Sequence, residues 1–198
     1  MKVAFINGSP RKGNTASGYL LERLEKKLPG CEIVPGWGEP CDAYVFAFPL
    51  YVDGIPSNLL RELVEHEQDM LPGARVYVLV NNGFYEGEQN AAAISMMRSW
   101  CARAGLLWGQ ALAVGGGGAL LLTTTPMGKL LGRGAVKKRN LALDILAGHI
   151  LTGDGGEDII CSPNMPRALY MRGGDAGFRL EGKKNGLTKQ EMERHAYD

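Results

Sequence analysis

The segment KVAFINGSPRKGNT (residues 2–15) contains a short apolar run, a glycine-rich turn and the start of a helical pattern. Residues 2–7 predict a β-strand, because a short apolar run that ends at a turn signal is typical of a buried strand. Apolar residues then recur at helical spacing over 16–28. A strand, a glycine turn and a helix in this order form the first half of a βαβ unit. The segment therefore indicates an α/β fold.

The same alternation continues along the chain. Further apolar runs predict strands at 31–34, 43–48, 75–81 and 106–114, and helical patterns cover 59–64, 93–104 and 127–151. Most of the runs are continuously apolar, as strands covered on both faces are. We predict a doubly wound, five-stranded parallel sheet with helices on both faces over residues 1–155. Residues 156–198 are expected to form a C-terminal helical extension that packs on this domain or on a partner subunit.

Composition excludes several classes of protein. The chain has 198 residues and a net charge of +1, from 22 Lys+Arg and 21 Asp+Glu, which indicates one soluble domain and argues against nucleic-acid binding. Its four cysteines lie far apart without a C-x-x-C pair, and its three histidines are scattered, so we expect no disulfide framework and no metal site. The N-terminus lacks a signal-peptide pattern, which favours a cytoplasmic location. Residues 105–128 carry no charge, but glycines interrupt them, so we expect no membrane span.

Glycine is the unusual component, with 28 residues, about twice the ordinary share of ~7%. Many of these glycines lie in four loops that follow predicted strands, at 8–15, 49–56, 81–87 and 115–118. In an open parallel sheet, ligands bind at the carboxyl ends of the strands. The glycines are therefore expected to bring backbone close to a ligand at that edge.

The first loop suggests a phosphate site. Backbone amides at the start of the helix, together with the side chains of Ser9, Asn14 and Thr15, can hold a phosphate without a metal. Ordinary turn chemistry and a helix cap at Asn14 or Thr15 are the alternative. The loop also approaches the nucleoside-triphosphate motif G-x-x-x-x-G-K-[ST]. Asn14 replaces its lysine, however, and no acidic residue ends a strand to hold magnesium, so a monophosphate fits better.

The next two loops suggest a flat heterocycle. Pro49, Leu50 and Tyr51 offer an apolar and aromatic face, although a rigid connector would have the same composition. Asn82 and the backbone around Gly83 can donate to a polar ring edge. No G-x-G-x-x-G follows a strand, which argues against a Rossmann dinucleotide site.

Taken together, INGSPRKGNT (6–15), FPLY (48–51) and NGFYEG (82–87) resemble the flavodoxin-like NAD(P)H-dependent FMN reductase family over roughly residues 1–155. PNMPR (163–167) through KKNGL (183–187) resembles the C-terminal arm of a subgroup. The resemblance implies a flavodoxin-like sheet of order 2-1-3-4-5 that binds FMN. The cofactor-binding residues that it implies, completed by their loop neighbours, are Ser9, Arg11, Lys12, Gly13, Asn14 and Thr15 in the first loop, Pro49, Leu50, Tyr51 and Val52 in the second, and Asn82, Gly83, Phe84 and Gly116 beyond them. Related iron-sulfur flavoproteins carry a compact cysteine cluster that this chain lacks, so no cluster is expected.

The resemblance also implies an activity. Hydride would pass from NADH or NADPH through FMN to a quinone, a flavin or another small acceptor, in a homodimer or homotetramer. No catalytic side chain is required, because flavin N5 carries the hydride chemistry. The main alternative is a flavodoxin-type electron carrier without NAD(P)H turnover, although such carriers are strongly acidic. A nucleoside-triphosphate enzyme and a domain that has lost its flavin and serves as an interaction module are further alternatives.

Overall fold

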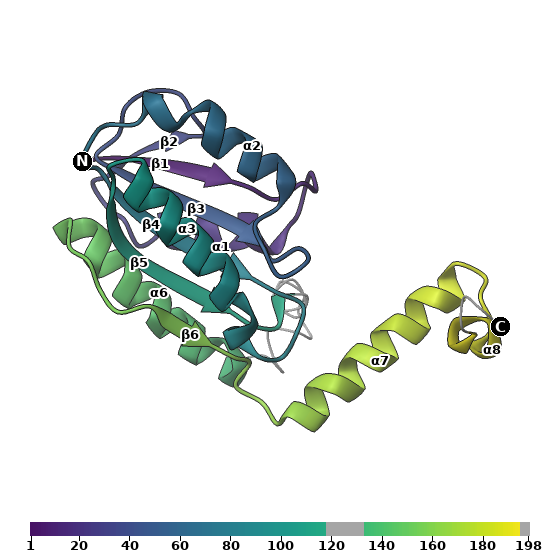
Figure 1. Cartoon of the computed structure of the whole chain (residues 1–198). Coiled ribbons are helices and arrows are strands. Elements are labelled where there is room, and N and C mark those ends of the chain that lie inside the picture. The colour runs from purple at the N-terminus through teal and green to yellow at the C-terminus, as the bar shows by residue number, and fades with distance from the viewer. Residues whose placement is uncertain (118–132, 195–198) are drawn as a thin grey trace. The chain divides into compact units, whose positions relative to one another are not determined.

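The computed structural model describes residues 1–117 and 133–194 (Figure 1). Six strands of the described chain form one parallel sheet in the order β2-β1-β3-β4-β5-β6. The strands are β1 (Lys2–Asn7), β2 (Glu32–Pro35), β3 (Ala43–Pro49), β4 (Arg75–Asn81), β5 (Leu107–Val114) and β6 (Ile159–Cys161). The first five confirm the order 2-1-3-4-5.

The predicted strand number was wrong, because β6 adds a sixth strand within residues that the sequence assigned to the helical extension. It pairs with β5 from Leu112↔Ile159 to Val114↔Cys161. Asp158, just before β6, accepts hydrogen bonds from Trp108 Nε1 at 3.1 Å and from the Ala111 amide at 2.9 Å. These contacts anchor a strand of three residues that has little pairing of its own.

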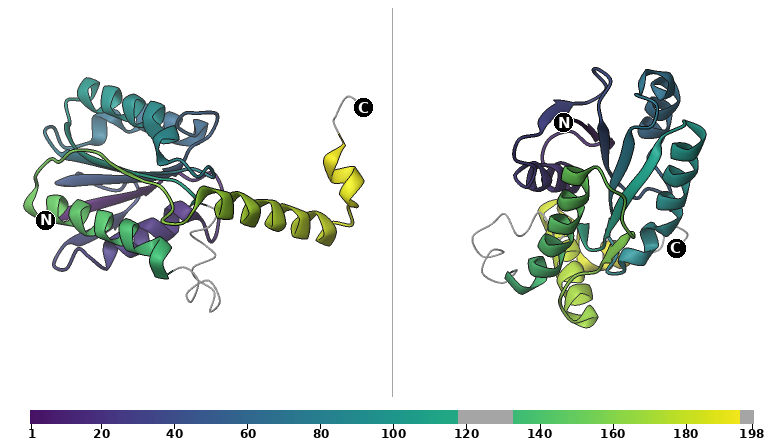
Figure 2. Two further views of the ribbon diagram at one scale, coloured as in Figure 1. Left: turned by 90° about the horizontal axis from the view of Figure 1, so that it is seen from below. Right: turned by 90° about the vertical axis from the view of Figure 1, so that its left-hand side faces the viewer.

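Helices cover both faces of the sheet, as Figure 2 shows in its left view. The helices of this part are α1 (Ala16–Glu25), α2 (Ser57–Glu65), α3 (Ala91–Arg103) and α6 (Arg133–Thr152), with 3-10 turns η1 (Glu67–Asp69) and η2 (Gly87–Asn90). The helix expected over 127–151 corresponds to α6 from residue 133 onward. The first part of the expected helix, 127–132, lies outside the described residues.

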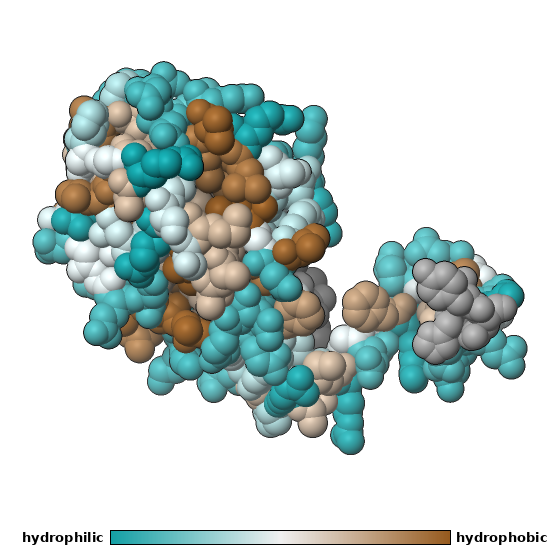
Figure 3. Space-filling view, viewed as in Figure 1, coloured by the Kyte–Doolittle hydropathy of each residue, from teal (hydrophilic) through white to brown (hydrophobic). Residues whose placement is uncertain are grey.

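Two hydrophobic cores fill the space between the sheet and these helices. Alternate residues of β1 enter different cores: Ala4 and Ile6 pack with α2 and α3, and Val3 and Phe5 pack with α1 and α6. This alternation is the two-residue period of a strand that is buried on both faces. Figure 3 shows apolar side chains over α2 and α3 among hydrophilic ones, and Leu60, Val64 and Met96 are exposed there.

The chain divides into two compact units, Met1–Asn164 and a second that begins at Met165. The second unit contains α7 (Arg167–Lys184) and α8 (Lys189–Glu193). Thr188 caps α8: its hydroxyl accepts from the Glu191 amide, and the Glu191 carboxylate accepts from the Thr188 amide. None of the described helices is long and apolar enough to cross a lipid bilayer.

Candidate functional site

The loop after β1 is fixed by its neighbours at the carboxyl edge of the sheet. The Gly8 amide donates to the Ala47 carbonyl at 2.9 Å, and the Gly8 carbonyl accepts from Asn58 Nδ2 at 3.3 Å. A Cβ on Gly8 would lie 2.5 Å from Leu59 Cδ2, so α2 packs where a side chain would stand. Thr15 caps α1 by accepting from the Gly18 amide at 3.1 Å. The helix cap that the sequence left open at Thr15 is therefore present.

The loop after β3 is a tight turn beside the first loop. The Leu50 amide donates to the Asn81 carbonyl at 2.7 Å, and Tyr51 and Gly54 exchange backbone hydrogen bonds at 3.1 and 2.9 Å. Val52 and Asp53 between them have φ of 48° and 55°. Both lie in the left-handed region, which is unusual for residues other than glycine. The turn leaves Val52 fully exposed and Tyr51 partly exposed.

The loop after β4 rests on the glycines that follow β5. The Gly116 amide donates to the Phe84 carbonyl and the Gly117 amide to the Asn82 carbonyl, both at 2.6 Å. A Cβ on Gly115 would lie 2.3 Å from the Tyr85 carbonyl oxygen. The absence of side chains at these glycines therefore allows their backbone to approach the backbone of the loop after β4. The Gly116 amide donates within the protein and is not available to a ligand.

The end of β6 also holds this loop. The Gly115 amide donates to the Cys161 carbonyl at 2.8 Å, and the Gly87 amide donates to Ser162 Oγ at 3.0 Å. Ser162 Oγ in turn lies 3.4 Å from Glu88 Oε2. A short strand that the sequence did not predict thus positions a loop that the sequence placed at the site.

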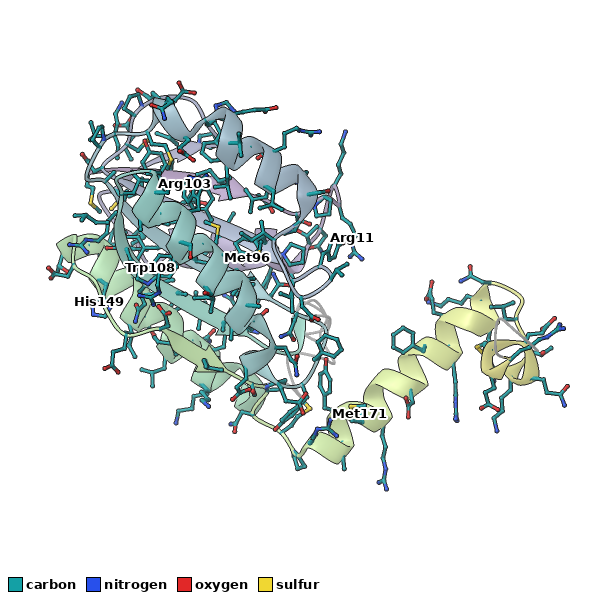
Figure 4. All side chains as sticks on the ribbon, in the orientation of Figure 1. Arg11, Met96, Arg103, Trp108, His149 and Met171 are labelled. Atoms are coloured by element: carbon teal, nitrogen blue, oxygen red, sulfur yellow. The ribbon has the colours of Figure 1, made fainter. Side chains whose placement is uncertain are left out.

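These loops enclose a cavity of about 180 Å³. It is lined by Ser9, Arg11, Ala16, Ser17, Pro49, Leu50, Tyr51, Asn81, Asn82, Gly83 and Gly117. Figure 4 shows Arg11 on the loop at the edge where the strands end. The volume is below the roughly 300 Å³ of typical ligand pockets, so the cavity would cover only part of a ligand of FMN size.

Half of the residues expected at the site line this cavity: Ser9, Arg11, Pro49, Leu50, Tyr51, Asn82 and Gly83. The other expected residues are not part of its lining: Lys12, Gly13, Asn14, Thr15, Val52, Phe84 and Gly116. Four lining residues were not expected: Ala16, Ser17, Asn81 and Gly117. Ala16 and Ser17 follow the Thr15 cap directly, and this position in the first helical turn is the signal by which they could have been found.

Ser17 and Asn81 form a buried polar pair in the cavity wall. Asn81 Nδ2 donates to Ser17 Oγ at 2.9 Å and to the Phe48 carbonyl at 3.0 Å. A hydroxyl that accepts in this way still has its own proton to donate. Ser17 can therefore donate a hydrogen bond to a ligand in the cavity.

Asn82 presents an unpaired acceptor. Its Nδ2 donates to the Glu86 carbonyl at 3.0 Å, whereas its buried Oδ1 has no hydrogen-bond partner within the described chain. A buried polar atom without a partner costs roughly 1–3 kcal/mol. A ligand that donates an N–H or O–H at this point would remove that cost.

The charge of the cavity favours an anion. Arg11 is the one charged side chain on the wall formed by the described residues. The wall includes Ala16 and Ser17 at the start of α1, where the helix dipole adds positive potential.

Burial raises the pKa of Cys101 to about 11 and also raises that of Cys161, and neither thiol lines the cavity. Over residues 1–117 and 133–194, no three metal-ligating side chains come together.

Comparison with known proteins supports the fold. No protein-family model and no curated protein sequence matches the chain. Solved structures do match. A short-chain flavodoxin associated with a non-canonical PDU bacterial microcompartment has a TM-score of 0.56 at 13% identity, covering 77% of this chain and 99% of that one. An NAD(P)H:quinone oxidoreductase from Methanothermobacter marburgensis has a TM-score of 0.54 at 15% identity, with 79% and 97% covered.

A flavodoxin from Streptococcus pneumonia TIGR4 is similar to the same degree, with a TM-score of 0.54 at 16% identity over 76% of this chain and 98% of that one. Identities this low carry information on the fold and not on the activity. The chain has a flavodoxin-like α/β fold, as its sequence predicted.

Proposed function

We propose that the chain binds FMN at this cavity and passes hydride from NADH or NADPH through it to a quinone, a flavin or another small acceptor. The observation that carries the proposal is the composition of the cavity wall. One part of the wall contains Arg11 and the N-terminus of α1. A second part is the apolar and aromatic segment 49–51. The third is Asn82, whose buried amide oxygen has no hydrogen-bond partner among the described residues. A phosphate, a flat ring and a ring N–H are the groups that complement these three parts.

The residues that line the cavity fit FMN in the following way. Ser9, Arg11 and the start of α1 hold the phosphate, with the Ser17 hydroxyl as a further donor. Pro49, Leu50 and Tyr51 line the ring system, and Asn82 and Gly83 meet its polar edge. The remaining expected residues act through the shape of their loops: Lys12, Gly13, Asn14, Thr15, Val52, Phe84 and Gly116.

When bound, the flavin supplies the hydride chemistry, and the protein supplies position and electrostatics. Backbone amides of the loop at 83–85 would stabilise negative charge on the reduced ring, whereas the Asn82 amide already donates to the Val114 carbonyl at 3.0 Å. A nicotinamide would need access to one face of the ring, and a cavity of about 180 Å³ would leave part of a bound FMN uncovered. The homodimer or homotetramer implied by the resemblance remains a prediction.

A flavodoxin-type electron carrier is the second candidate, because two of the similar structures are flavodoxins. The balance of 22 basic and 21 acidic residues argues against it, since carriers dock to protein partners through a strongly charged surface. Oxidation of NADH or NADPH by the isolated, FMN-loaded protein would favour the reductase. FMN binding without such turnover would favour the carrier.

The test compares two neighbouring cations that the sequence assigned to the same role. Arg11 lines the cavity and Lys12 does not. Arg11→Ala is expected to weaken FMN binding about tenfold, as loss of a charge-assisted hydrogen bond to phosphate does, and to leave riboflavin binding unchanged. Lys12→Ala is expected to have a smaller effect on FMN. Flavin fluorescence quenching measures both ligands; a wild-type protein that does not bind FMN would overturn the proposal.

A further inference from the structure

Two arginines and a tyrosine that do not line the cavity form a cluster between α1 and α6. Arg23 Nε donates to Tyr19 Oη at 3.2 Å, and Arg139 Nη2 donates to the same oxygen at 3.3 Å. Each guanidinium carbon also lies 5.4 Å from the centre of the Tyr19 ring. We call Tyr19, Arg23 and Arg139 the arginine–tyrosine cluster.

Arg139 is the unusual member of the cluster. Its relative exposure is 3%, and its buried Nε has no hydrogen-bond partner among the residues that the structure describes. Arginine is almost never fully buried unless it is paired, yet no carboxylate of the described residues forms an ion pair with Arg139. Burial and the nearby Arg23 both lower the pKa of Arg139. The guanidinium of Arg139 is therefore buried without a carboxylate from the described residues to neutralise its charge.

Neighbouring acidic groups do not supply the missing charge. Glu22, next to Arg23, forms an ion pair with Lys26 at 2.6 Å, and Asp144 of α6 pairs with Lys27. Lys138, adjacent to Arg139, adds a further exposed cation. The surface between α1 and α6 thus has an excess of positive charge around the cluster.

Tyr19 Oη, which accepts from both guanidinium groups, is a weaker hydrogen-bond acceptor than a carboxylate or phosphate oxygen. A charge-assisted hydrogen bond to an anionic oxygen is usually about 2.7–2.9 Å long and roughly twice as strong as a neutral one. Here both arginines share one phenol oxygen, at 3.2 and 3.3 Å. Each arginine directs one N–H at Tyr19 Oη, and neither forms an ion pair with a carboxylate of the described residues, so their positive charge remains available to an added oxyanion.

We propose that the arginine–tyrosine cluster binds a phosphate group at the surface between α1 and α6. Arg23, which is exposed, contacts the phosphate directly, and Arg139 supplies the buried charge behind it. Tyr19 and Arg23 share one face of α1 with Ala16, at positions i, i+3 and i+7, so the site begins near the cavity rim but does not use Arg11. Inorganic phosphate and the 2′-phosphate of NADPH offer the same chemistry.

The experiment measures binding of two probes, inorganic phosphate and adenosine 2′,5′-bisphosphate, by isothermal titration calorimetry at constant ionic strength. The protein is saturated with FMN, so that the flavin phosphate cannot be mistaken for the new site. Arg23→Met and Arg139→Met are each expected to weaken binding of the better probe about tenfold. Arg61→Met is the matched control, because Arg61 is an exposed arginine of α2, on the other face of the sheet.

Adenosine 2′,5′-bisphosphate that binds at least tenfold more tightly than inorganic phosphate would identify a nucleotide as the ligand; equal affinities would identify free phosphate. The proposal is overturned if wild-type protein binds neither probe, or if Arg23→Met behaves like Arg61→Met. Arg23 is exposed, so that variant decides the question even if Arg139→Met fails to fold. If FMN itself does not bind, the same variants are compared without it, and failure of the flavin proposal stays separate from failure of this one.

Discussion

At the scale of single residues, backbone strain beside the cavity is concentrated at Val52. This β-branched residue has φ of 48° and a relative exposure of 102%, so burial of its side chain does not stabilise this conformation. Such a conformation costs on the order of 1–3 kcal/mol. Asparagine tolerates the left-handed region and is preferred in turns of this kind. Val52→Asn is therefore expected to raise the free energy of unfolding by about 1 kcal/mol, measured by urea denaturation.

Val64→Asn is the control for that prediction, because Val64 is also largely exposed but lies in the regular helix α2. It should not stabilise the protein. A decrease in stability for Val52→Asn would mean that the exposed valine side chain makes a contact that offsets the strain.

A second residue-scale prediction concerns Tyr77 and alkaline pH. The single proton of its buried hydroxyl is shared between the carbonyls of His149 at 2.9 Å and Asp154 at 2.7 Å, and burial raises the pKa of Tyr77 from 10.0 to about 12. A raised pKa means that the folded protein holds the phenol proton more tightly than the unfolded chain does. This contribution to stability is complete below pH 10 and is lost as the pH rises towards 12.

We expect the wild-type free energy of unfolding to fall over this pH range more steeply than that of Tyr77→Phe. The variant should be the less stable protein at pH 7, since the two carbonyls lose the donor that they share. Denaturation curves at pH 7, 10 and 11.5 measure the difference. Parallel pH profiles would show that another group controls the alkaline transition.

At the scale of elements, the glycines after β5 set the position of the loop at 82–87. In Gly115→Ala the new Cβ would lie 2.3 Å from the Tyr85 carbonyl oxygen and 2.9 Å from the Gly87 amide nitrogen. Both obstacles are backbone, so the loop has to move. We expect a loss of stability of about 2 kcal/mol and a large loss of FMN affinity, measured by denaturation and fluorescence titration.

Gly148→Ala is the matched substitution, because Gly148 lies within α6 and, apart from its chain neighbours and the backbone of its own helix, no described atom is within 4 Å of its Cβ position. Alanine favours the helix, so this variant should gain roughly 0.5–1 kcal/mol and bind FMN normally. If Gly115→Ala binds FMN equally well, the loop does not position the cofactor.

The elements also show which parts of the fold a sequence pattern can predict. Continuously apolar runs identified β1, β3, β4 and β5 almost to their ends, because strands covered on both faces have no polar positions to obscure them. β6 has only three residues, and its middle residue, Ile160, is exposed. It is a strand because Asp158 and the edge of β5 hold it, and those contacts are not visible in local sequence.

The site divides in the same way. Seven residues predicted from loops that follow strands line the cavity, because all strands of a parallel sheet end at one edge: Ser9, Arg11, Pro49, Leu50, Tyr51, Asn82 and Gly83. Ser17 and Asn81, which also line the cavity, were not predicted, since a side-chain contact between α1 and β4 brings them together. Gly116 was predicted to bind the cofactor because it lies in a glycine-rich loop after a strand, but its amide donates to the Phe84 carbonyl.

At the scale of the whole molecule, the core and the cavity belong to the first compact unit. Both hydrophobic cores and every residue that lines the cavity lie before Met165. In the second unit, α7 buries only Gly182 among its described residues. The sequence places the domain boundary at residue 155, but β6 and Ser162 lie beyond that point. Two truncated chains therefore test where the domain ends.

A chain that ends at Asn164 keeps both cores, β6 and the hydrogen bond from Gly87 to Ser162. We expect it to unfold cooperatively at a temperature close to that of the full chain and to bind FMN with similar affinity. A chain that ends at Gly155 loses Asp158, the pairing of β6 with β5 and the Ser162 contact. It should be less stable by at least about 2 kcal/mol and should bind FMN weakly, because the loop at 82–87 loses its support.

Calorimetry and flavin titration of the two chains give the comparison. If the longer chain also failed to fold, α7 and α8 would contribute to the stability of the first unit; if both chains behaved alike, β6 would have no part in positioning the site.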